Sequence, residues 1–196
     1  IILPHIQILP SILAANQNEL SSECVRAEVA GGDQVHIDVM DGIFVPNVNF
    51  SPNTVKTSAA SVNIPQNVHL MTQNPSLIIS EYADAGASTI HIHEESAGNT
   101  SDTLRIIRDK GIRAGISINP ETSVDKILSY IADNEVDDVL LMSVNPGRGG
   151  QKYISEVESK ILSIRRVFSE IDITMDGGVD NQSIVSAAAH GANIFV

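Results

Sequence analysis

Short aliphatic segments alternate along the whole chain with segments whose apolar residues have helical spacing. The clearest helical stripe has an i, i+3, i+4, i+7 pattern typical of a half-buried helix: Val124, Ile127, Leu128 and Ile131. The aliphatic segments, each short enough to be a strand, lie at residues 7–13, 34–40, 67–71, 89–93, 113–118, 138–144, 171–175 and 193–196. Strands that alternate with helices in this way predict right-handed βα units in one parallel sheet.

Eight such units predict a closed, parallel, eight-stranded (β/α)8 barrel, the TIM barrel, as a single domain over residues 1–196. A doubly wound open sheet is the alternative, but that fold usually carries a glycine-rich turn after its first strand. Residues 14–17 follow the first predicted strand here and contain no glycine. Because such barrels typically have about 250 residues, we expect this α/β chain to end at its eighth strand without the final helix.

Charge and cysteine content exclude several classes of function. The chain has 12 basic and 24 acidic residues, a formal net charge of -12, and no basic stripe, so we expect no nucleic-acid binding. The single cysteine, Cys24, lies in an amphipathic stretch and is interpreted as a buried structural thiol in a reducing compartment.

No segment approaches the roughly 18 apolar residues needed to span a bilayer. The opening residues 1–4 are too few for a signal peptide and lack its basic flank. We therefore expect a cytoplasmic protein with no membrane partner.

The second aliphatic segment carries the strongest indication of a functional site. Side chains on a strand alternate between two faces, so His36 and Asp38 share the face opposite the aliphatic residues. The same alternation points His69 on the third strand and Asp176 at the end of the seventh into the barrel. Two imidazoles and two carboxylates are a suitable donor set for zinc or another divalent transition ion. Four unrelated, locally hydrogen-bonded groups are the alternative, but their position at the same end of their strands favours a shared site.

Two glycine-rich turns follow late strands, at residues 145–151 and 176–178. Such turns expose backbone N–H groups that bind phosphate, and barrels commonly bind phosphate near the loops of their last strands. The glycines predicted to contact a phosphorylated substrate are Gly147, Gly149, Gly150, Gly177 and Gly178.

These motifs together resemble those of the ribulose-phosphate 3-epimerase family, whose members are (β/α)8 barrels. The matching segments are residues 10–15, 36–47, 68–71, 140–147 and 176–178. The resemblance implies an enzyme of pentose phosphate metabolism that interconverts D-ribulose 5-phosphate and D-xylulose 5-phosphate. It also implies that the protein is a homo-oligomer.

The resemblance further implies roles for individual residues. The ligands of one divalent ion, with zinc favoured over iron, manganese and cobalt, would be His36, Asp38, His69 and Asp176. Asp38 and Asp176 would also transfer the proton at C3 through an enediolate. Besides the glycines, the substrate-contacting residues would be Ser11, His69, Met40, Met71 and Met142. For Met142, ordinary core packing is a comparable interpretation.

The chain departs from the family pattern in two places. Arg148 stands where the family usually has phenylalanine, and it either adds a cation near the phosphate or extends into solvent, which we prefer. The Gly-Ser pair that usually follows the eighth strand and helps to hold phosphate is absent from the printed sequence. We therefore expect this chain to lack part of its phosphate cradle.

Other functions share parts of the pattern. An epimerase of a related ketose phosphate, such as allulose 6-phosphate, would differ in loop length, which one sequence does not decide. Schiff-base aldolases and orotidine-phosphate-type decarboxylases need a strand lysine, whereas all five lysines lie in predicted helices or loops. A metal-dependent sugar-phosphate lyase passes this test. A non-catalytic phosphosugar-binding protein would not need opposed carboxylates.

Overall fold

The computed structural model describes residues 5–196, so the opening segment 1–4, for which no signal peptide was predicted, lies outside the described residues. One curled sheet has the strand order β1-β9-β8-β7-β6-β5-β4-β2-β3. Its strands are β1 (Gln7–Ile8), β2 (Val35–Asp41), β3 (Val48–Asn49), β4 (Gln66–Met71), β5 (Thr89–His93), β6 (Arg113–Ile118), β7 (Asp138–Met142), β8 (Asp172–Asp176) and β9 (Ile194–Phe195). All the pairings are parallel except that of β3, which runs antiparallel to β2.

The first and second strands close the sheet into a barrel. β1 pairs with β9 on one side. On the other side, the chain that follows β1 joins β2, because the amide of His36 donates to the carbonyl of Pro10 (3.0 Å) and the amide of Ile12 donates to the carbonyl of His36 (3.1 Å). The predicted parallel (β/α)8 barrel is therefore confirmed, with β3 as an unpredicted addition.

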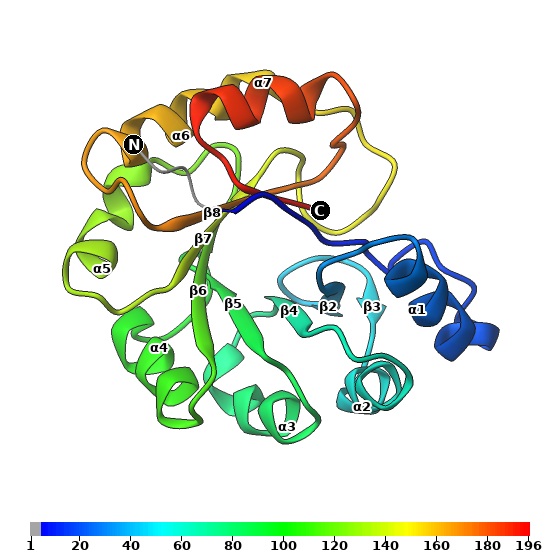
Figure 1. Ribbon diagram of the computed structural model, residues 1–196. Helices are drawn as coiled ribbons and strands as arrows, with labels where there is room; N and C mark the ends of the chain where they lie inside the picture. The colour runs from blue at the N-terminus through cyan, green and yellow to red at the C-terminus, as the bar shows by residue number, and fades with distance from the viewer. Residues whose placement is uncertain (1–4) are drawn as a thin grey trace.

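The helices surround this barrel, as Figure 1 shows. They are α1 (Leu20–Val29), α2 (Pro52–Ser61), α3 (Ile79–Asp84), α4 (Thr100–Asp109), α5 (Leu128–Ala132), α6 (Glu158–Arg165) and α7 (Ser183–His190). None of the helices within residues 5–196 is long and apolar enough to cross a membrane. Cys24 on α1 is fully buried, with Sγ 3.3 Å from Oγ of Ser58 on α2, so its predicted role as a packed structural thiol is confirmed.

Two predicted elements differ most from the structure. The first strand was expected over residues 7–13 but ends at Ile8, because Pro10 has no N–H for a regular ladder. The helical stripe that begins at Val124 is divided between a 3₁₀ turn, Val124–Lys126, and the short helix α5. The spacing from Val124 to Ile127 is three residues, which fits a 3₁₀ turn as well as an α-helix.

The strand residues divide between two cores, as their alternation predicts. Outward-facing residues such as Ile37, Ile90 and Ile116 are buried with apolar residues of the helices. The barrel interior is polar, with buried His91, Asp138 and other polar side chains. Because buried polar groups need partners, this interior requires precise contacts between strands.

Candidate active site

Three strands bring the four predicted metal ligands together. His36 and Asp38 lie two residues apart on β2, and the parallel register with β4 places Asp38 opposite His69. Asp176 is the last residue of β8. All four side chains are buried, and one donor atom of each lies within 4.8 Å of every other. These residues, hereafter the four-donor cluster, therefore converge as predicted.

Imidazole nitrogens and carboxylate oxygens alternate around the cluster. Nε2 of His36 lies 3.2 Å from Oδ1 of Asp38 and 3.3 Å from Oδ2 of Asp176. Nδ1 of His69 lies 3.2 Å from each of the same two oxygens. Oδ2 of Asp176 is buried and accepts no hydrogen bond from residues 5–196. Neither nitrogen meets this oxygen with hydrogen-bond geometry, so a metal ion would supply the partner that buried carboxylate oxygens normally have.

The spacing of the donors fits one divalent ion. Zinc ligands lie about 2.0–2.2 Å from the ion, so neighbouring ligand atoms are roughly 2.9 Å apart at right angles and roughly 3.4 Å apart in a tetrahedron. The four separations of 3.2–3.3 Å fall between these values. The residues present therefore fit a divalent metal.

The cluster is also electrostatically suited to a cation. Burial disfavours the charged imidazolium, but Asp38 and Asp176 outweigh it, so that the pKa of His36 rises to about 10 and the pKa of His69 also rises. Burial would likewise raise the pKa of both carboxyl groups, yet the two imidazoles hold each carboxyl pKa below its ordinary value. The cluster therefore favours positive charge, which a bound divalent ion would supply in place of the imidazole protons.

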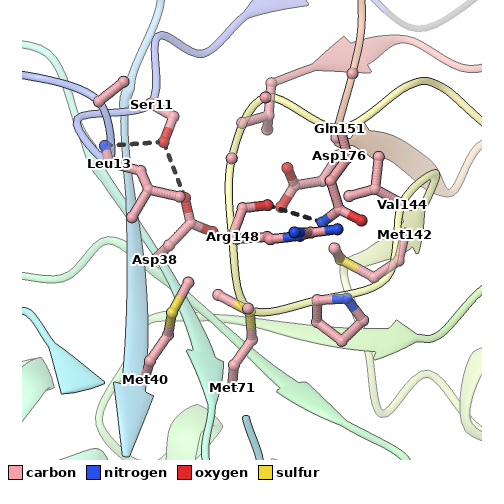
Figure 2. A pocket seen from close by; sticks show the side chains of 18 residues that line it. Ser11, Leu13, Asp38, Met40, Met71, Met142, Val144, Arg148, Gln151 and Asp176 are labelled. Atoms are coloured by element: carbon pink, nitrogen blue, oxygen red, sulfur yellow. Dashed lines mark hydrogen bonds between the residues drawn. The ribbon is translucent and has the colours of Figure 1, made fainter. Parts of the chain in front are cut away.

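The two carboxylates of the cluster lie at the floor of a pocket at the carboxyl ends of the strands, shown in Figure 2. The pocket has a volume of about 180 Å³. Asp38 and Asp176 line it, whereas His36 and His69 are fully buried and do not. The other predicted substrate-contacting residues all line the same pocket: Ser11, Met40, Met71, Met142, Gly147, Gly149, Gly150, Gly177 and Gly178.

The glycine turns leave several backbone amides free. Four of these amides donate to no backbone acceptor within residues 5–196: those of Gly149, Gly150, Gly177 and Gly178. Gly178 has φ +66°, and a Cβ there would lie 2.6 Å from the carbonyl oxygen of Gln151 and 2.7 Å from the amide nitrogen of Tyr153. Only glycine fits this position. The turn therefore leaves backbone N–H groups free to bind an anion.

Two polar residues beside the cluster have different roles. Ser11 donates from Oγ to Oδ2 of Asp38 at 2.9 Å, which orients that carboxylate at the pocket floor. Asp41, at the end of β2, instead accepts backbone N–H groups of Ile43, Phe44 and Gln73. Asp41 therefore shapes the loop and does not belong to the four-donor cluster.

Sequence comparison connects this site to known proteins. The family model described as "Ribulose-phosphate 3 epimerase family" matches residues 7–196. A ribulose-phosphate 3-epimerase of Bacillus subtilis is 38% identical over 97% of this chain and 89% of its own length. One from Escherichia coli is 40% identical over 96% of this chain and 85% of its own length. The chain belongs to the ribulose-phosphate 3-epimerase family.

Solved structures support the fold of this family member. A tryptophan synthase α-subunit of Pyrococcus furiosus has a TM-score of 0.73 at 15% identity, covering 100% of this chain and 88% of that one. An N-acetylmannosamine-6-phosphate 2-epimerase of Clostridium perfringens has a TM-score of 0.71 at 12% identity, covering 97% and 85%. At such low identity these likenesses establish only the barrel architecture.

In this ribulose-phosphate 3-epimerase family member, Arg148 is exposed yet also lines the pocket, as Figure 2 shows. Its side chain therefore borders both solvent and the space above the cluster. The sequence-based site omitted several other lining residues: Leu13, Ala14, Val144, Pro146, Gln151 and Val196. These residues follow strands in the sequence and lie beside predicted site residues, and this position could have indicated that they line the pocket.

Proposed function

We propose that this protein interconverts D-ribulose 5-phosphate and D-xylulose 5-phosphate by inversion at C3. The observation that carries the proposal is the pair of carboxylates, Asp38 and Asp176, which come from different strands to one pocket floor. The substrate class is supported by the family membership and by the free amides of the glycine turns above that floor. The reaction belongs to pentose phosphate metabolism.

Inversion requires one proton-transfer group on each face of a planar intermediate. The proton at C3 is acidic because C3 is adjacent to the C2 ketone, and its removal produces an enediolate. One of the two residues Asp38 and Asp176 takes this proton as a carboxylate, and the other, as a carboxylic acid, returns a proton to the opposite face. Ser11 holds Asp38 in position through its 2.9 Å hydrogen bond.

The four-donor cluster would hold the divalent ion. When bound, this ion would supply Lewis-acid stabilisation of the negative charge on the enediolate oxygens. We propose zinc, because two imidazole nitrogens and two carboxylate oxygens at this spacing suit it. The buried sulfurs of Met40, Met71 and Met142 would provide a largely apolar wall beside the reacting carbons. We further propose that the protein is a cytoplasmic homo-oligomer.

Solvent exchange tests the reaction directly. The protein is incubated with ribulose 5-phosphate in deuterated water, and incorporation of deuterium at C3 is measured together with formation of xylulose 5-phosphate. Exchange that is lost with a chelator and restored by a divalent metal is expected. Allulose 6-phosphate is assayed in parallel. A much higher kcat/KM for that sugar than for ribulose 5-phosphate would identify it as the substrate instead.

Variants test the roles of the carboxylates. Asp38→Asn and Asp176→Asn should each abolish epimerisation while circular dichroism remains that of the folded protein. Asp109→Asn, which changes an exposed carboxylate on α4, is the matched control and should leave turnover unchanged. Near-normal turnover in either active-site variant would refute the two-carboxylate mechanism.

A further inference from the structure

The second ring nitrogen of His69 faces away from the four-donor cluster. Its Nε2 lies 2.8 Å from Nε2 of His93, which is the next inward-facing position on β5 beyond His91. The two rings are stacked, with centroids 5.0 Å apart and planes inclined by 25°. Two ring nitrogens can share a hydrogen bond only if one carries the proton and the other offers a lone pair.

The far side of His93 determines which nitrogen carries that proton. Nδ1 of His93 lies 3.0 Å from Oε2 of Glu95, and an ionised carboxylate can only accept, so Nδ1 must donate. Neutral His93 then has a bare Nε2, which accepts the N–H at Nε2 of His69. As a result, when His69 is neutral, as metal binding requires, its lone pair lies on Nδ1, the atom that faces Asp38 and Asp176.

Glu95 is itself firmly anchored. Its Oε1 accepts the backbone N–H of Asn119 at 2.8 Å and the hydroxyl of Thr122 at 2.5 Å, both in the loop after β6. Phe44 packs against His93 from the loop after β2, with ring centroids 4.8 Å apart. The side chain of His93 is fully buried, whereas that of Glu95 is 21% exposed. The chain of contacts therefore runs from the cluster to the edge of the barrel.

We propose that Glu95 and His93 form a relay that positions His69 as a metal ligand, by fixing its proton on Nε2 and its lone pair on Nδ1. The inference rests on the proposed metal site and extends it to two residues that touch neither substrate nor metal. Outer partners of this kind orient metal-binding imidazoles and increase their basicity, and their loss typically weakens metal binding about 10–100-fold. His36 has a simpler partner, the side-chain oxygen of Asn67 at 3.0 Å from its Nδ1.

Metal affinity measured without substrate tests the relay. Competition with a chromogenic chelator for zinc and for cobalt is compared in the wild type, Glu95→Gln and His93→Gln. Glu94→Gln is the matched control, because Glu94 is the adjacent carboxylate and contacts Thr100 and Tyr130 instead. We expect about 10–100-fold weaker binding in the two relay variants and unchanged binding in the control. Affinities within twofold of the wild type in both relay variants would overturn the proposal.

Nitrogen NMR of ¹⁵N-histidine-labelled, zinc-loaded wild type provides a test that does not depend on variants folding. The proposal requires a proton on Nε2 of His69 and protonation of His93 only on Nδ1. A proton on Nδ1 of His69, or a doubly protonated His93, would refute it. If the wild type binds no divalent metal at all, the proposed metal-dependent function fails. If it binds metal with the other tautomers, only the relay fails.

Discussion

Gly115 on β6 leaves the space that the ring of His91 occupies inside the barrel. A Cβ at position 115 would overlap this ring, at 2.5 Å from Nε2 and 2.6 Å from Cγ. The ring has no freedom to move, because it is fully buried and its Nε2 lies 2.9 Å from Oδ2 of Asp138. Thr174 donates to both oxygens of the same carboxylate. We therefore predict that Gly115→Ala destabilises the protein strongly.

The magnitude follows from two effects. Forcing an extra carbon into a packed interior costs about 1–3 kcal/mol. Displacing His91 from Asp138 leaves a buried polar group with fewer partners, which costs about 1–3 kcal/mol more. The free energy of unfolding should thus fall by about 4 kcal/mol. For a chain of this size, that corresponds to a melting temperature lower by roughly 8–16 °C.

Thermal and urea unfolding of the metal-free protein measure this loss. Gly149→Ala is the control, because a Cβ at that position would meet only Leu13 at an ordinary 3.7 Å. A double-mutant cycle with His91→Ala identifies the contact, since Gly115→Ala should cost much less once the ring is removed. A Gly115→Ala protein that melts within 2 °C of the wild type, or an additive cycle, would refute the reasoning.

Three further predictions concern the site. Burial would raise the pKa of Glu95, but hydrogen bonds from His93, Thr122 and Asn119 lower it to about 2. The contribution of Glu95 to the free energy of unfolding is therefore fully present above the unfolded-state pKa of 4.5. This contribution is lost as the pH falls toward 2. Acid titration of unfolding should show a smaller loss over this interval for Glu95→Gln than for the wild type. Ser11→Ala removes the hydrogen bond to Asp38 and should lower kcat/KM about 10–100-fold in steady-state assays, whereas an unchanged value would show that Asp38 needs no such support. Arg148→Ala should raise KM up to about fivefold with little change in kcat, because an exposed ion pair between Arg148 and the substrate phosphate would contribute at most about 1 kcal/mol. An unchanged KM would mean that the Arg148 side chain extends into solvent and does not contact the phosphate.

The residues of the four-donor cluster could be predicted because strand periodicity is local. Once His36 and Asp38 lie on the polar face of a strand, their common direction follows from the pleat alone. The polar partners inside the barrel were harder to predict. His91 on β5 pairs with Asp138 on β7, a residue 47 positions later in the chain. β3 forms only because its two residues meet β2 after a turn.

Alternation of apolar and polar residues therefore specified the barrel class, the inward faces and the four residues of the four-donor cluster, since each depends on neighbours along the chain. Distances across the barrel depend instead on how all the strands tilt and stagger when the sheet closes. Closure sets the 3.2–3.3 Å spacing of the four-donor cluster and brings His93 to the back of His69. It also places the ring of His91 against Gly115, a contact that neither residue indicates by itself.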